Sequence, residues 1–129
     1  MKTKPAACLS VLQAEYKSLR KLNDPPHPTF SGTTGTSAIT KAQMHLLTEA
    51  VFFAAFRSYE QFLRNVFLLY CSGVQSSGRK LVRTFLQPKT VNHAETLIKS
   101  SMPFLDWSSP DTLIDRSEAY LKDGYPVKN

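Results

Sequence analysis

Three ionisable side chains lie close together within an apolar stretch of the sequence: Arg57, Glu60 and Arg64. Spacings of three and four residues place them on one face of a helix, in the order that favours a salt bridge between the glutamate and the second arginine. A carboxylate and a guanidinium held on a core helix can bind an anion or orient a reacting group. The same spacing suits a structural ladder of ion pairs. We favour the ladder because polar groups on a buried helix need partners.

A second candidate group is basic, and it is the tightest cluster of cations in the chain: Arg79, Lys80 and Arg83. The formal net charge is +6, from 16 Lys and Arg against 10 Asp and Glu. This balance favours an anionic partner, such as nucleic acid or an acidic protein, without identifying it. We interpret the cluster as a solvated helix face, with weak contact to nucleic-acid phosphates as the alternative.

Cysteine and histidine residues are few and far apart. The two cysteines, Cys8 and Cys71, fit no metal-binding or redox spacing and are expected to be small buried thiols. The three histidines, His27, His45 and His93, have no second ligand at metal-binding spacing. No nucleophile elbow surrounds a serine. The sequence therefore predicts no metal, no cofactor and no complete catalytic motif.

The first helix is predicted over residues 6–22, where apolar side chains recur every three or four residues: Leu9, Leu12, Tyr16 and Leu19. Pro25 and Pro26 must end it, because proline lacks the amide donor and disfavours a helical residue before it. The segment 23–37 is rich in Pro, Gly, Ser and Thr, which predicts a flexible loop.

A long central helix is predicted from about Ala38 to Tyr70, with Ser37 as its N-cap and Gly73 in its closing turn. Its apolar side chains cover most of its circumference, so we expect other helices to surround it and bury most of it. Residues 50–71 have the length of a membrane span. The three ionisable groups in their middle exclude a span, because each charge is unfavourable in the bilayer.

Three shorter helices are predicted after the long one. The first spans residues 79–86 and has four apolar side chains on one face: Leu81, Val82, Phe85 and Leu86. The second begins at Asn92, where Glu95 completes the spacing of a capping box. The third begins at Ser109, ahead of a proline in the first helical position, and continues to Gly124.

These elements predict one all-α domain over residues 1–129, a helical bundle of about five helices around a long central helix. A chain of this length can bury one hydrophobic core. The N-terminal residues lack the pattern of a secretory signal. We therefore expect a cytoplasmic location with reduced thiols.

The long helix also carries a family resemblance. Residues 56–67, an aromatic helix in which Glu60 precedes a Phe-Leu pair, resemble the early core helix of HEPN-type domains (higher eukaryotes and prokaryotes nucleotide-binding). Residues 107–110 and 120–126 are similar to the segment before the final helices of some of these domains, so the resemblance covers about residues 38–127. It implies an α-helical bundle that commonly dimerises. In active members, which belong to defence or toxin systems, it implies RNA cleavage without a metal.

The sequence departs from this family at the catalytic motif, an arginine and a histidine separated by four to six residues in a late helix. Arg20 and His27 have a suitable spacing, but two intervening prolines prevent a helix that would align them. The chain also ends where the motif-bearing helix is expected. The resemblance therefore implies either a fragment of a longer protein or a non-catalytic relative, and in both cases a bundle that is catalytically inactive as this chain. The candidate catalytic residues are the family position and its neighbours: Glu60, Arg64 and Arg57.

Another function class fits the same sequence: a helical protein-interaction module or homodimerising domain without nucleic-acid chemistry. Its partner would bind apolar surface that a missing helix leaves exposed. The expected partners are thus a second copy, another protein or RNA, with no membrane and no metal.

Overall fold

The computed structural model describes residues 4–23, 41–74, 80–101 and 106–128. Within these ranges the chain is helical and has no β-strand, which confirms the all-α prediction for this part of the chain. The elements are α1 (Pro5–Asn23), α2 (Lys41–Cys71), α3 (Val91–Ser101), α4 (Pro110–Tyr120) and a short 3-10 helix, η1 (Lys122–Gly124). Most of the predicted loop at 23–37, the predicted N-cap Ser37 and the predicted helix start at Ala38 lie outside the described residues.

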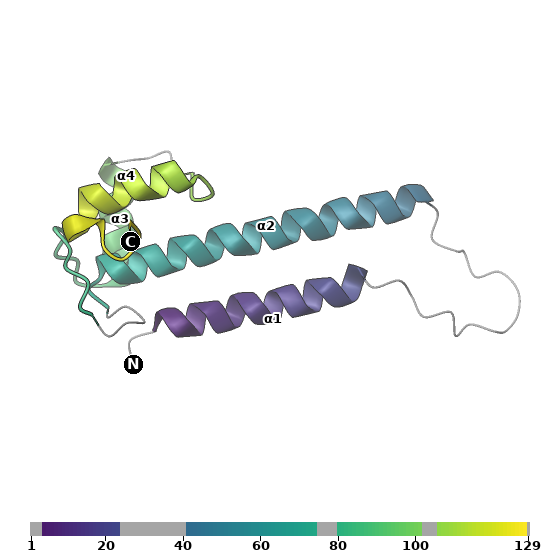
Figure 1. Cartoon of the computed structure of the whole chain (residues 1–129), viewed down its shortest axis with the longest axis horizontal. Helices are drawn as coiled ribbons and strands as arrows, with labels where there is room; N and C mark the ends of the chain where they lie inside the picture. The colour runs from purple at the N-terminus through teal and green to yellow at the C-terminus, as the bar shows by residue number, and fades with distance from the viewer. Residues whose placement is uncertain (1–3, 24–40, 75–79, 102–105, 129) are drawn as a thin grey trace, which may run out of the picture.

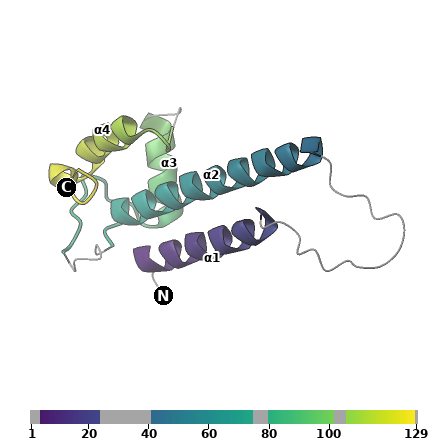
Figure 2. The same cartoon turned by 45° about the vertical axis from the view of Figure 1, so that its right-hand side comes forward.

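The helices α1 and α2 lie side by side and run antiparallel, which makes a long helical hairpin (Figures 1 and 2). In α1, Leu12 is buried, and Cys8 and Leu19 are half-buried. Spacings of four and seven residues put these three side chains on one stripe of the helix. The prediction of a first helix over residues 6–22 is confirmed to within one residue at each end.

The hydrophobic core lies at the C-terminal end of α2, where α3, α4 and the segments between them meet (Figure 2). Its buried members are Phe67, Leu68, Cys71, Val82, Ala94, Ile98, Trp107, Tyr120 and Leu121. The Phe67 and Trp107 rings are 5.5 Å apart between centroids, and the guanidinium of Arg116 lies 5.5 Å from the Trp107 ring centroid. Each large apolar side chain buried here contributes about 1.5–3 kcal/mol before the entropy of ordering is counted.

The end of α2 is closed by Gly73, as its position in the sequence predicts. Gly73 has a φ of 80°, in the left-handed region. The Gly73 amide donates to the Tyr70 carbonyl, and the Val74 amide donates to the Leu69 carbonyl 3.2 Å away. These two bonds form a Schellman motif, which satisfies carbonyl groups that the helix leaves unpaired.

The long helix is not buried along its length, so this part of the prediction is wrong. α1 covers one face of α2, and α3 contacts only its C-terminal part (Figure 1). The buried residues of α2 all lie in its last turns: Phe67, Leu68, Leu69 and Cys71. The apolar circumference of the helix therefore exceeds the surface that the other described helices cover. None of the described helices is long and apolar enough to cross a membrane.

The prediction of a helix over residues 79–86 is also wrong, because residues 80–90 contain no helix. Thr84 instead forms an isolated antiparallel bridge with Leu121. The Lys122 amide donates to the Arg83 carbonyl 2.8 Å away, and the Phe85 amide donates to the carbonyl of Tyr120 2.9 Å away. The described part of the predicted bundle thus has four α-helices rather than five.

The starts of the last two helices follow local capping chemistry. At α3 the side chain that caps the first turn is Thr90 rather than Asn92. The Thr90 hydroxyl accepts from the His93 amide at 3.1 Å. The capping-box prediction is therefore wrong. At α4 the prediction is confirmed, since the Ser109 hydroxyl accepts from the amide of Thr112. α4 ends at Tyr120 and not at Gly124, because extended backbone at Leu121 separates it from η1.

Candidate interaction surfaces

The three side chains of the predicted polar stripe do not form one site. Arg57 is exposed, while Glu60 and Arg64 are half-buried. Arg64 donates to the carboxylate of Glu95, which comes from α3. The pairing of Glu60 with Arg64 that their spacing favours is therefore replaced by a contact between two helices. Among the described residues, Arg57 and Glu60 form no salt bridge.

Glu95 lies between two cations and ties α3 to α2. Its Oε1 atom accepts from Arg64 and lies 2.7 Å from the Lys99 ammonium, one helical turn further along α3. Hydrogen bonds from Lys99 and then from Arg64 lower the pKa of Glu95 below its ordinary value of 4.5. The carboxylate is therefore ionised at neutral pH, and this charge network explains why Glu95 does not turn back to cap its own helix.

The variant Glu95→Gln is expected to lose less than about 1 kcal/mol of stability at pH 7, the range for partly exposed ion pairs. Because folding lowers the pKa of Glu95, its contribution is present above the unfolded-state pKa and disappears as the pH falls through the folded-state pKa. Urea unfolding of both proteins at pH 7 and at pH 3 would measure this. A stability difference that stayed the same at both pH values would contradict the assignment.

The most extended apolar surface lies on the first two-thirds of α2. We call it the α2 aromatic face, and its members are Leu46, Phe52, Phe53, Phe56 and Tyr59. Phe52 and Phe53 are 65% and 67% exposed. The Phe52 ring lies 6.0 Å from the Phe53 ring and 6.5 Å from the Phe56 ring, between centroids. The rings of Phe52, Phe53 and Phe56 therefore form one continuous exposed apolar surface, with Leu46 and Tyr59 on either side of it along the helix.

The α2 aromatic face continues a stripe that is buried at the other end of the helix. Phe53, Phe56, Glu60, Leu63 and Phe67 follow one another at spacings of three and four residues, so they lie on one side of α2. Phe67 is buried in the core, whereas Phe53 and Phe56 are exposed. The same side of α2 is thus covered at one end and uncovered at the other, as the arrangement of helices in Figure 1 also shows.

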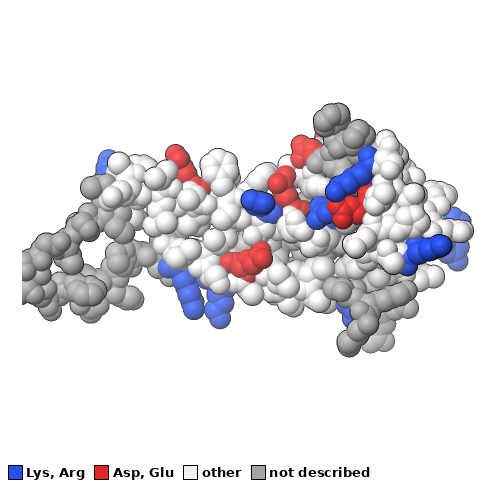
Figure 3. All heavy atoms as spheres, turned by 180° about the vertical axis from the view of Figure 1, so that it is seen from behind, with Lys and Arg blue, Asp and Glu red and all other residues white. Residues whose placement is uncertain are grey.

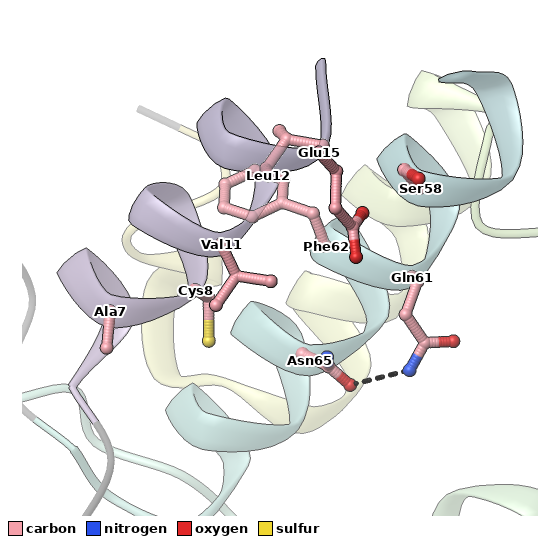
Figure 4. A pocket seen from close by; sticks show the side chains of 9 residues that line it. All are labelled: Ala7, Cys8, Val11, Leu12, Glu15, Ser58, Gln61, Phe62 and Asn65. Atoms are coloured by element: carbon pink, nitrogen blue, oxygen red, sulfur yellow. Dashed lines mark hydrogen bonds between the residues drawn. The ribbon is translucent and has the colours of Figure 1, made fainter. Parts of the chain in front are cut away.

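A shallow groove of about 240 Å³ lies between α1 and α2 (Figure 4). Its lining residues are Ala7, Cys8, Val11, Leu12 and Glu15 from α1, and Ser58, Gln61, Phe62 and Asn65 from α2. The side-chain amides of Gln61 and Asn65 bond to each other at 3.1 Å. The groove is therefore mainly apolar, and the Gln61 amide nitrogen donates to the amide oxygen of Asn65 at its edge.

The predicted basic cluster is only partly described, because Arg79 lies outside the described residues. Lys80 and Arg83 are exposed, on extended chain rather than on the predicted helix face. The bridge to Leu121 adds Lys122, which is also exposed and which sequence spacing did not associate with them. In Figure 3, the end of the molecule that carries this segment displays Lys and Arg side chains without Asp or Glu.

Among the described residues, the thiols of Cys8 and Cys71 and the imidazoles of His45 and His93 do not gather into a metal site. Burial raises the pKa of Cys71 to about 12 and also raises the pKa of Cys8. Both thiols are therefore protonated at neutral pH, and neither is an activated nucleophile. Cys71 is buried as predicted, whereas Cys8 is half-buried at the groove. Among the described residues, no group of three His, Cys, Asp or Glu side chains is arranged to hold a metal ion.

Two of the groups that shape these surfaces, Glu95 and Lys122, are not predicted from the sequence. Glu95 was assigned to a cap, although a glutamate one turn before Lys99 is also a signal for an ion pair. Lys122 was not associated with Arg83, although Val, Thr and Phe at residues 82, 84 and 85 favour extended chain.

Comparisons of the chain with protein families, with curated proteins and with solved structures gave no match.

Proposed function

We propose that the protein is a self-associating helical interaction domain, in which the α2 aromatic face binds the same face of a second copy. The observation that carries this proposal is the exposure of four neighbouring aromatic rings and a leucine on one helix. Single exposed apolar residues are common on proteins, but a continuous patch of this kind marks an interaction surface.

The exposed area of the patch is sufficient for a pair of identical faces. Aromatic side chains bury about 150–250 Å² each when they are fully covered. The four rings are 65%, 67%, 41% and 40% exposed, which leaves roughly 400 Å² to be covered per copy. Two copies contribute about 800 Å², and Leu46 with the flanking side chains brings the total near the roughly 1,000 Å² of a specific interface.

The charges beside the patch are arranged for pairing with a second copy. Glu49 lies four residues before Phe53, and Arg57 lies four residues after it. In an antiparallel pair of α2 helices whose two-fold axis passes near Phe53, Glu49 of each copy lies opposite Arg57 of the other. Both side chains are exposed, and neither has a salt-bridge partner among the described residues. The second copy therefore supplies opposite charges on both sides of the aromatic rings.

Association is expected to depend on Phe53 at the centre of the patch. Phe53→Glu places an unpaired charge against the apolar rings of the second copy. The dimerisation affinity should therefore fall at least tenfold. Sedimentation velocity over a range of protein concentrations measures this directly. Gln13→Glu adds the same charge on the exposed surface of α1 and should leave the association unchanged. A wild-type protein that stays monomeric at its highest soluble concentration would refute the proposal.

The antiparallel arrangement has its own test. Glu49→Arg and Arg57→Glu each place like charges at two symmetric contacts, and each change should weaken association about tenfold, from roughly 0.7 kcal/mol per exposed pair. The double variant restores opposite charges and should recover most of the affinity. If the double variant associates more weakly than either single variant, the antiparallel pairing is wrong even if Phe53 is essential.

The resemblance to HEPN-type domains, the absence of ribonuclease activity and the cytoplasmic location remain predictions. The ion pair between Arg64 and Glu95 supports a structural role for Arg64 rather than a catalytic one. Glu60, the residue that matches the family position, lies on the same side of α2 as the aromatic face. A HEPN-like ancestry and a present role in self-association are therefore compatible.

A further inference from the structure

The end of the molecule opposite the α2 aromatic face carries a separate surface, which we call the basic end surface. Its members are Lys80, Arg83, Phe85, Lys122 and Tyr125. Along residues 82–86, buried or half-buried side chains alternate with exposed ones: Val82, Thr84 and Leu86 point inward, and Arg83 and Phe85 outward. The extended chain therefore places a cation and a ring on the solvent side, two residues apart.

Backbone hydrogen bonds hold the parts of this surface together. The Lys122 amide donates to the Arg83 carbonyl at 2.8 Å, which brings the two cations to neighbouring positions. The Thr84 hydroxyl donates to the Tyr120 carbonyl at 3.1 Å and accepts from the Leu86 amide at 3.0 Å. The surface is thus fixed by the end of α4 and by the core residue Leu121, which is fully buried.

Each aromatic ring of the basic end surface lies beside a cation. The Lys122 ammonium is 5.9 Å from the centroid of the Phe85 ring, and the Lys80 ammonium is 4.5 Å from the centroid of the Tyr125 ring. Phe85 nevertheless remains 60% exposed. A large part of its ring is therefore available to a planar ligand, next to positive charge.

Positive charge predominates around these rings. Residues 80–86 and 121–125 contain three cations and one acid, Asp123. The nearby carboxylate of Glu118 forms a salt bridge with Lys128. On the face drawn in Figure 3, this end of the molecule shows blue atoms and no red ones. An anionic ligand is therefore attracted to this end of the molecule.

We propose that the basic end surface binds single-stranded nucleic acid, with one base stacked on Phe85 and phosphates beside Arg83, Lys122 and Lys80. Exposed rings interleaved with cations are the features by which proteins hold unpaired bases without reading their sequence. A duplex stacks its bases on each other and offers the ring no free base face. An anionic membrane would use the charges but would not need an aromatic ring in place of another apolar side chain.

The proposal predicts different effects for the ring and for the charges. A fluorescent single-stranded RNA of mixed sequence is the probe, and anisotropy measures its binding to the full chain at several salt concentrations. Three phosphate contacts predict a slope of about −2 in a plot of log affinity against log salt. Arg83→Gln should reduce this slope by about 0.7, whereas Phe85→Leu should weaken binding about fivefold or more and leave the slope unchanged.

Three controls make the outcome decisive. Phe85→Tyr keeps the ring and should bind like the wild type, and Lys17→Gln removes an exposed charge from α1 and should leave the salt slope unchanged. Duplex RNA of the same length should bind at least tenfold more weakly than the single strand. Equal binding of duplex and single strand, an unchanged affinity in Phe85→Leu, or binding only to phosphatidylserine vesicles would each overturn the proposal.

Discussion

Phe67→Ala is expected to lower the free energy of unfolding by about 3–5 kcal/mol, the usual effect of removing a large aromatic side chain from a core. Phe67 is 2% exposed, and its ring packs against Trp107. Alanine would leave a cavity between α2 and the segments that cover it, because the surrounding side chains can collapse only partly. Urea unfolding followed by circular dichroism measures the loss.

Phe53→Ala is the matched control, because it makes the same chemical change on the same helix. Phe53 is 67% exposed, so in dilute solution, where the protein is monomeric, its removal should change stability by less than about 0.5 kcal/mol. At high concentration the same variant should weaken self-association instead. Equal losses of stability in the two variants in dilute solution would contradict the location of the core at one end of α2.

Gly124→Ala is expected to destabilise the protein by roughly 2–5 kcal/mol. Gly124 has a φ of 65°, where a residue with a Cβ atom is about 1–2 kcal/mol less favourable. The added Cβ would also lie 3.0 Å from the Lys128 Cβ and 3.2 Å from the Ser117 hydroxyl oxygen. Overpacking of a buried position adds roughly 1–3 kcal/mol. Thermal unfolding of the variant and the wild type would measure the sum.

Gly73→Ala separates the two contributions to that loss. Gly73 has a φ of 80°, but a Cβ atom there would meet nothing within 4 Å. Its replacement should therefore show only the conformational effect, about 1–2 kcal/mol. If Gly73→Ala were as destabilising as Gly124→Ala, the close packing of Gly124 against Ser117 and Lys128 would not be the cause of the larger loss.

Features that depend on neighbouring residues could be predicted from the sequence. The Ser109 cap of α4 and the turn at Gly73 follow from residue types within a few positions of each helix end. The stripe of α1 follows from the spacing of Leu12 and its neighbours. In each case the chemistry that decides the structure lies within one or two helical turns.

Features that depend on residues far apart in the sequence could not be predicted from it. The partner of Arg64 is 31 residues away in the sequence, so its local spacing to Glu60 gave the wrong ion pair. Thr84 bonds to the Tyr120 carbonyl 36 residues away, and this pairing outweighs the weak helical pattern of residues 79–86. The exposure of Phe53 could not be predicted for the same reason. The apolar pattern of a helix does not show how much of its surface distant helices cover.

Because α2 is covered unevenly, its two halves are expected to differ in the free energy of local opening. The helix is one continuous run of backbone hydrogen bonds, but its C-terminal turns belong to the core, while the described helix that lies along the turns around Phe53 is α1. Regions with few buried contacts open locally at a lower free energy than the core. In a single copy we therefore expect the turns around Phe53 to open at a lower free energy than the C-terminal turns of α2. Association at the α2 aromatic face would reduce this difference, so slower amide exchange in the first half of the helix would accompany binding.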